Sequence, residues 1–168
     1  MRLLKIFFDY SCPFCRKAYE YLVELVAEDG DLFSDIGIEW HPCEAHPRPD
    51  SYGPHSDLCI RGMYFAEDAG ADIWQYNARM FDAVFVSHID IEDAAALAEF
   101  VSDIVDAEAF KEALTSGRYE DRLQAGNDYA YKVSGVWAVP SYRLDGEELN
   151  AIENVGVTKE ELRSLISA

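Results

Sequence analysis

The chain has 168 residues, of which 49% are hydrophobic and 27% charged. This composition excludes disorder as the general state and suits one domain, or one domain that carries a large insertion. Thirty-two acidic residues against 14 basic ones give a formal net charge of −18. Nucleic acid and anionic membranes are therefore disfavoured as partners, because both are bound chiefly through Lys and Arg. The acidity indicates a solvated face, or alternatively a surface that meets a basic protein substrate.

The sequence shows no targeting or membrane segment. No stretch reaches the roughly 18 apolar residues that span a bilayer, and the apolar run at the amino end is too short for a signal peptide. We therefore expect a cytoplasmic protein. Four cysteines, Cys12, Cys15, Cys43 and Cys59, are too few and too unevenly placed for a secreted disulfide scaffold. We expect Cys43 and Cys59 to be unpaired thiols, with a disulfide between them as the alternative.

The first third of the chain has the pattern of one β-α-β unit. The continuous apolar run from Leu3 to Asp9 predicts a strand buried on both faces. A long helical pattern follows the turn at Tyr10-Ser11 and closes at Gly30, and residues 36–40 predict a second strand. This order implies two parallel strands joined by a right-handed crossover.

The middle of the chain is predicted to be a long loop followed by helices. Four prolines between residues 41 and 55 exclude a helix or a central strand there. From residue 56 to about 116 the pattern is helical throughout, with Asp72, Asp90 and Asp106 as expected N-caps. We expect these helices to form an insertion that ends near Gly117.

The last quarter of the chain predicts a helix, two short strands and a final helix. The expected elements are a helix over 119–134, a connection and strand over 136–144, a hairpin turn at Asp145-Gly146, a strand near 149–152, and a helix over 159–166 behind a capping box of Thr158 and Glu161. The predicted division is a first half of the fold in residues 1–55, a helical insertion in 56–117, and a second half in 118–168.

The segment Cys12-Pro13-Phe14-Cys15 carries the strongest chemical signal. It lies between the carboxyl end of a buried strand and the amino end of a helix, where unpaired backbone N–H groups favour negative charge. A thiolate at Cys12 is stabilised there, and Cys15, one helical turn further, can resolve a mixed disulfide. Pro13 suits the first helical turn because its missing N–H is least needed there. The pattern predicts a redox pair.

Two other interpretations of this segment stay open. The two cysteines can form a structural staple, although so small a ring contributes only about 2 kcal/mol. They can also join His41, Cys43 and His46 in a zinc site. Zinc-binding pairs usually sit in loops with a second matched pair, whereas this pair opens a helix after a buried strand. The position favours redox chemistry, and no metal is predicted.

The residues around this pair resemble a known family. Phe8-Asp9-Tyr-Ser-Cys-Pro-Phe-Cys15 resembles the active-site motif of the DsbA-like branch of the thioredoxin superfamily. The segments 106–110, 116–119 and 135–142 resemble the FrnE and 2-hydroxychromene-2-carboxylate isomerase type. The resemblance spans nearly the whole chain. It implies the α/β thioredoxin fold, β-α-β followed by α-β-β-α, with an all-helical insertion, and a thiol-disulfide oxidoreductase that needs no bound cofactor.

The resemblance also implies how a substrate is held. It implies a cis peptide between Val139 and Pro140 beside Cys12, whose backbone groups pair with an extended substrate segment. The expected partners are proteins or peptides that carry a disulfide or thiols, with glutathione as a further candidate. The residues expected to contact a substrate are Pro13, Phe14, Trp137, Val139 and Pro140.

Two departures from the family bear on the direction of the reaction. The chromene carboxylate isomerases and kappa-class glutathione transferases carry Ser where this chain has Cys12, so the cysteine pair favours dithiol exchange. The periplasmic oxidase has a histidine in place of Phe14, and its loss implies a less oxidising protein that works as a reductase or isomerase. The alternatives are a glutathione-dependent isomerase or transferase, and a zinc- or peptide-binding module.

Asp9 is a further candidate for the site. As the last residue of the strand before the cysteines, it can relay a proton, or it can bond the amides of the adjacent turn. The four histidines show no helical metal spacing, and none is given a catalytic role.

Overall fold

A computed structural model describes all residues, 1–168, and the chain forms two units. One unit consists of residues 1–45 and 128–168 and contains the sheet; the other consists of residues 46–127 and is helical. The predicted fold class, an α/β thioredoxin fold with a helical insertion, is confirmed. No helix is both long and apolar enough to cross a membrane.

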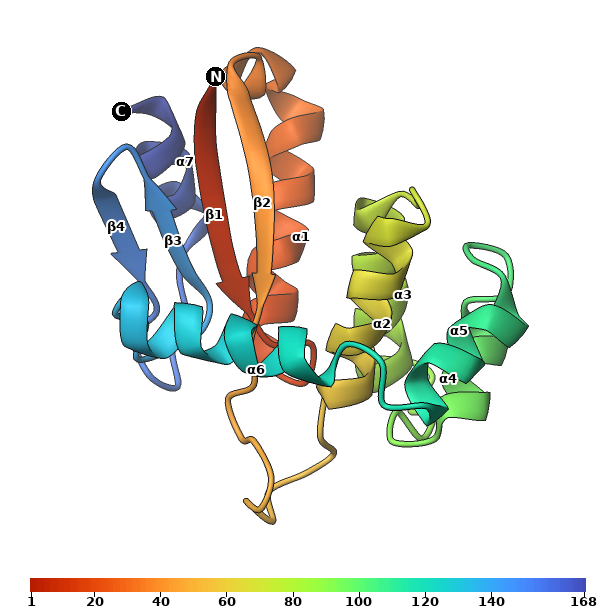
Figure 1. Cartoon of the computed structure of the whole chain (residues 1–168). Helices are drawn as coiled ribbons and strands as arrows, with labels where there is room; N and C mark the ends of the chain where they lie inside the picture. Colours follow the sequence, from red (N-terminus) through yellow and green to blue (C-terminus); the bar gives the residue numbers. More distant parts are fainter. The chain divides into compact units, whose positions relative to one another are not determined.

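The first unit is built on a four-stranded mixed sheet (Figure 1). Its strands are β1 (Arg2–Phe8), β2 (Ile36–Pro42), β3 (Ser141–Leu144) and β4 (Glu147–Asn150), in the spatial order β2-β1-β3-β4. The β1 and β2 strands are parallel, whereas β3 is antiparallel to both β1 and β4. Because Phe7 pairs with Ser141, the carboxyl end of β1 lies beside the amino end of β3.

Helices α1 (Pro13–Glu28) and α7 (Lys159–Ser167) pack together on one face of this sheet (Figure 1). Lys159 joins them, since its Nζ lies 2.9 Å from a Glu24 carboxylate oxygen and 2.7 Å from one of Glu28. The predicted capping box of α7 is confirmed: the Thr158 hydroxyl accepts the Glu161 amide, and the Glu161 carboxylate accepts the Thr158 amide.

The opposite face of the sheet is covered near the end of β1 by a π-helical turn, η2 (Tyr129–Val133). Phe7 forms a buried cluster there with Cys43, Ala130 and Val136. The single helix predicted over 119–134 is therefore wrong in its second half. Helix α6 (Glu120–Asp128) gives way to η2, in which the Ser134 amide donates to the Tyr129 carbonyl.

Two strand limits also differ from the prediction. β2 continues through Pro42 because it is an edge strand. No strand lies on its outer side, so no inter-strand hydrogen bond is lost there for want of a proline N–H. The strand predicted over 136–144 begins only at Ser141. Residues 136–140 instead form a loop, whose first amide, that of Val136, closes η2 by donating to the Ala130 carbonyl.

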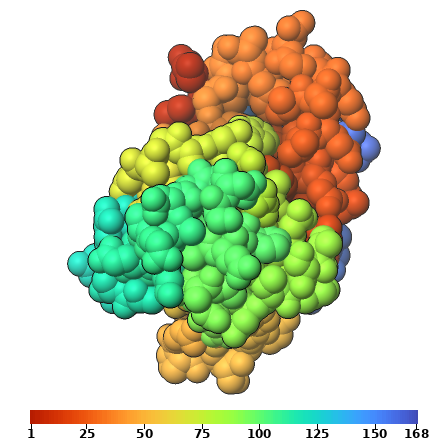
Figure 2. Space-filling model, turned by 90° about the vertical axis from the view of Figure 1, so that its right-hand side faces the viewer, coloured from red at the N-terminus to blue at the C-terminus, as the bar shows by residue number.

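The second unit contains α2 (Asp57–Asp68), α3 (Ile73–Phe85), α4 (Ala94–Phe100), α5 (Ala107–Thr115) and most of α6. Helices α4 and α5 pack against each other, and Figure 2 shows their outer surface. The predicted caps Asp72 and Asp106 are confirmed, since each carboxylate accepts amides of the following first turn. Asp90 does not cap a helix: it accepts the Glu92 amide within a turn, and Asp93 caps α4.

The helical unit extends beyond the predicted insertion, 56–117, at both ends. At its start, Arg48 and His55 of the proline-rich loop lie 2.6 Å and 3.1 Å from the carboxylate of Glu92. At its end, Arg122 of α6 lies 3.4 Å from the carboxylate of Asp68 in α2. These ion pairs join the proline-rich loop and α6 to the rest of the helical unit. The spacing of apolar residues, from which the insertion was predicted, gives no sign of such ion pairs.

The core of the helical unit depends on one close approach. Gly62 of α2 lies against the hydroxyl of Tyr76 and the ring of Phe110, so that a Cβ at residue 62 would overlap both. Tyr76 cannot easily yield because its buried hydroxyl donates to the Cys59 carbonyl at 2.7 Å. Arg61, also buried, donates to the Leu114 carbonyl at the end of α5 at 2.8 Å.

We predict that Gly62→Ala lowers the free energy of unfolding by about 1 to 3 kcal/mol, because the added methyl overpacks this core. Gly30→Ala is the matched control, since no atom lies within 4 Å of the position of its Cβ; its effect should stay within about 0.5 kcal/mol. Urea unfolding followed by circular dichroism measures both. Equal stability of the two variants would contradict the close packing.

Candidate active site

Cys12 occupies the N-cap position of α1. Its backbone is extended, with φ −93° and ψ 120°, and its Sγ accepts the amide of Cys15 at 3.4 Å. Pro13 follows in the first turn, as predicted, where it leaves no unpaired N–H. The Cys12 sulfur is therefore hydrogen-bonded to an amide of the first turn of α1, at the positive end of the helix dipole.

The two cysteines have opposite environments. The pKa of Cys12 is lowered by a hydrogen bond from the Cys15 side chain and by the amides of Cys15 and Phe14, against the opposing effect of partial burial. Cys15 is buried, and burial raises the pKa of its thiol well above the ordinary value. The Asp9 amide donates to its Sγ at 3.4 Å. One sulfur is thus prepared to be a thiolate and the other to remain a thiol.

The loop before β3 brings a backbone carbonyl to Cys12. The Val139–Pro140 peptide is cis, and the Val139 oxygen lies 3.8 Å from the Cys12 Sγ. The hydroxyl of buried Ser141 donates to the Ala138 carbonyl at 2.6 Å and so closes the loop. Two segments separated by more than 120 residues in the sequence meet at this sulfur.

Asp9 is buried between two turns. Its Oδ1 accepts the Ser11 amide and the Ser11 hydroxyl, both at 2.9 Å, and its Oδ2 accepts the Ala45 amide at 2.8 Å. Two roles were considered for Asp9, a proton relay and the bonding of amides in the adjacent turn. The contacts match the second role. The carboxylate thus joins the turn before Cys12 to Ala45, which follows β2. Its negative charge also opposes ionisation of both cysteines.

The remaining predicted site residues surround the cysteine pair in different ways. Phe14 is half-buried and packs against the backbone of Gly156, whose φ is +86°. Trp137 lies in the loop before Pro140, with 65% of its surface exposed. Phe14 is thus held by the turn before α7, whereas the Trp137 indole is accessible to a partner.

Two tyrosines near the site, buried Tyr142 and half-buried Tyr131, were not predicted. Burial, followed by electrostatic interaction with Cys15 and then with Cys12, raises the pKa of the Tyr142 hydroxyl in β3. Tyr131 of η2 donates its hydroxyl to the Glu44 carbonyl at 2.6 Å. Burial and the nearby Cys43 raise the pKa of Tyr131. The only feature of the sequence that could have indicated Tyr142 as a residue near the site is its position two residues after Pro140.

The other two cysteines lie in different units. Cys43 is buried in the sheet unit, and burial raises its pKa to about 12; Cys59 is buried in α2. Neither is in a disulfide, as predicted. The residues considered for a zinc site do not gather around a common point, and no group of three or more His, Cys, Asp or Glu residues is placed to hold a metal ion.

The model of the DSBA-like thioredoxin domain matches residues 3–163. The chain belongs to this family. Among solved structures, DsbA of Chlamydia trachomatis has a TM-score of 0.76 at 13% identity, over 99% of this chain and 85% of that one. BdbD of Bacillus subtilis, in its oxidised form, has a TM-score of 0.75 at 15% identity, over 98% and 85%.

A third similar structure is the cytosolic disulfide reductase DsbM of Pseudomonas aeruginosa with glutathione, with a TM-score of 0.72 at 17% identity over 98% of this chain and 96% of that one. None of the curated protein sequences matches the chain significantly. These similarities show that the DsbA-like fold extends over nearly the full length of the chain.

We predict that iodoacetamide labels Cys12 before every other cysteine of the native protein. The pH at which its labelling rate is half-maximal should lie below the ordinary thiol pKa of about 8.5. In Cys15→Ala the midpoint should rise, because the largest cause of the lowered pKa of Cys12 is removed. Mass spectrometry of the labelled peptides over a pH series measures both. Earlier labelling of Cys15, or an unchanged midpoint in the variant, would contradict the assigned environments.

Proposed function

We propose that the protein is a thiol-disulfide oxidoreductase in which Cys12 is the nucleophile and Cys15 the resolving cysteine. The observation that carries the proposal is the position of the Cys12 sulfur, which accepts an α1 amide and lies 3.8 Å from the Val139 carbonyl. Its lowered pKa supports the role of attacking and leaving thiolate, and the buried Cys15 suits a group that reacts only with its neighbour.

The exchange proceeds in two displacements. The Cys12 thiolate attacks one sulfur of a substrate disulfide, forms a mixed disulfide and releases the other sulfur as a thiolate. Cys15 then gives up its proton, attacks the Cys12 sulfur and releases the second substrate thiolate. The substrate gains two electrons from the cysteines, and its two thiols are completed by the proton from Cys15 and one proton from water. The protein ends with a Cys12–Cys15 disulfide.

The loop of residues 137–140 supports the binding of an extended substrate. We infer that the backbone around Val139 and Pro140 pairs with a substrate segment beside Cys12, and that the exposed Trp137 offers an apolar contact to it. Pro13 is exposed and Phe14 half-buried in the two positions after Cys12, so both are accessible to a substrate. Proteins or peptides that carry a disulfide or thiols are the substrates we propose.

We favour the reducing or isomerising direction and a cytoplasmic setting. The side chain of Phe14 supplies no hydrogen-bond donor to the Cys12 thiolate, so the thiolate is stabilised less than with a histidine side chain there. The similar structure of a cytosolic disulfide reductase with glutathione supports glutathione as the reductant. Two glutathione molecules would reduce the Cys12–Cys15 disulfide and leave as glutathione disulfide.

Reduction of insulin by glutathione tests the proposal. The wild-type protein should accelerate it, Cys12→Ser should lose the acceleration completely, and Cys15→Ser should accumulate a mixed disulfide at Cys12. Cys59→Ala is the matched control, because that thiol is buried in the helical unit, and it should retain the activity. Full activity of Cys12→Ser would contradict the proposal.

The Cys15→Ser variant also distinguishes the proposed dithiol exchange from the alternative function, a glutathione-dependent isomerase or transferase. An enzyme of that kind uses one sulfur-activating residue, so it would keep its turnover and saturate with glutathione when Cys15 is replaced. The proposed dithiol exchange predicts a loss of multiple turnovers in this variant, of about a hundredfold or more, because the mixed disulfide can no longer be resolved within the protein.

A further inference from the structure

A groove lies between the hairpin of β3 and β4 and helix α7, apart from the cysteine pair. It has a volume of about 650 Å³, and its apolar floor is formed by Leu144, Leu149 and Leu165. Arg2, at the amino end of β1, also lines it, whereas Cys12 follows the carboxyl end of that strand. The groove therefore lies at the opposite end of the sheet from the proposed active site.

One wall of this groove is the free edge of the sheet. β4 is the last strand in the order and is hydrogen-bonded to β3 alone. An edge strand presents unpaired N–H and C=O groups along its outer side, which form a template for another strand. Glu147 and Glu148 of β4 are exposed, and Leu149 is half-buried. The edge is therefore open to an added strand.

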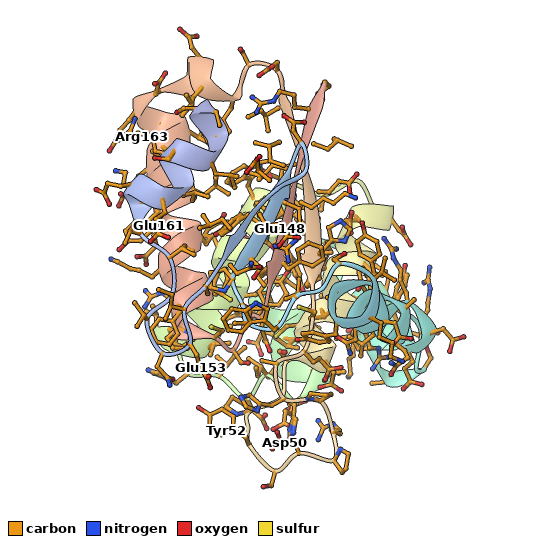
Figure 3. The ribbon with its side chains drawn as sticks, turned by 90° about the vertical axis from the view of Figure 1, so that its left-hand side faces the viewer. Asp50, Tyr52, Glu148, Glu153, Glu161 and Arg163 are labelled. Carbon is orange, nitrogen blue, oxygen red and sulfur yellow. The ribbon has the colours of Figure 1, made fainter.

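The rim of the groove is strongly acidic. Figure 3 shows this side of the sheet unit, with Glu148 and Glu161 labelled. Glu161 belongs to the capping box of α7, and Glu148 lies 3.3 Å from Arg143. Glu147 and Glu160 also line the groove, and both are exposed carboxylates. The rim thus has carboxylates on both the strand side and the helix side.

The cations of the groove do not balance this charge. Arg2 is the only cationic residue in its lining, and its guanidinium already forms a 2.5 Å contact with the Asp145 carboxylate. A second copy of the chain would bring an equally acidic rim to the same edge, which like-charge repulsion disfavours. The occupant that fits must bring positive charge together with apolar side chains.

We propose that the β4 edge and the groove bind an extended basic segment of a partner protein that carries both Lys or Arg and apolar residues. The segment adds as a strand to β4, so that every second residue faces the groove. Glu147 and Leu149 lie on this face of β4, two residues apart, so one groove-facing side chain of the segment is apolar and lies over Leu149 and Leu165, and the next is a cation that meets the carboxylates of Glu147 and Glu160. This docking is independent of the redox chemistry of Cys12.

A fluorescent octapeptide that repeats Lys-Lys-Leu-Leu is a direct probe of this docking, because each face of such a strand presents lysine and leucine in turn. We expect saturable binding by fluorescence anisotropy, weakened by salt, and no binding of a peptide that repeats Glu-Glu-Leu-Leu. In the double variant Glu147→Gln, Glu160→Gln the affinity should fall about three- to tenfold, since two exposed ion pairs are lost. Neither residue takes part in the capping box of α7.

The matched control is Glu108→Gln, Glu112→Gln, which removes the same charge from exposed positions of α5. Its affinity should change less than about twofold. Hydrogen exchange gives the second readout: the peptide should slow exchange of the β4 amides, residues 147–150. Equal weakening in the two double variants, absence of binding, or protection elsewhere than β4 would overturn the proposal. Insulin reduction by the Glu147, Glu160 variant should be unchanged.

Discussion

The interaction of the Cys12 sulfur with Cys15 is the one on which the site depends. The Cys15 side chain lowers the pKa of Cys12 most, and the Cys15 amide, 3.4 Å from the sulfur, joins Cys12 to the unpaired N–H groups of α1. A sulfur in this position is stabilised as an anion, and the buried sulfur of Cys15 is not. Two cysteines only three residues apart therefore differ chemically: the Cys15 side chain and the amides of α1 lower the pKa of Cys12, whereas burial raises the pKa of Cys15.

The rest of the sheet unit holds that terminus in place. β1 ends at Phe8, and buried Asp9 fastens the following turn by accepting the amides of Ser11 and Ala45. The pairing of β3 with β1 carries Val139 to the same sulfur from the far end of the chain. At the other end of the sheet, the open β4 edge and its acidic rim give the same unit a surface suited to a basic segment.

Local pattern was enough to predict the strand and the helix on either side of the cysteine motif, and the caps at Asp72, Asp106 and Thr158. The burial predicted on both faces of β1 holds only for its last three residues, since Leu3 is exposed and Lys5 half-buried. Tertiary context decided the rest. Pro42 stays in a strand because β2 is at an edge, the turn of Tyr129–Val133 has no local signal, and the place of Tyr142 beside the sulfurs depends on strand pairing.

A redox titration of the protein against glutathione tests the account most directly, with the state of Cys12 and Cys15 followed by mass spectrometry after rapid alkylation. We expect a single two-electron transition shared by the two cysteines, with a midpoint at or below about −180 mV, as for isomerases and reductases. Independent reaction of the two thiols with glutathione, or a midpoint near about −120 mV as for strong oxidants, would contradict it.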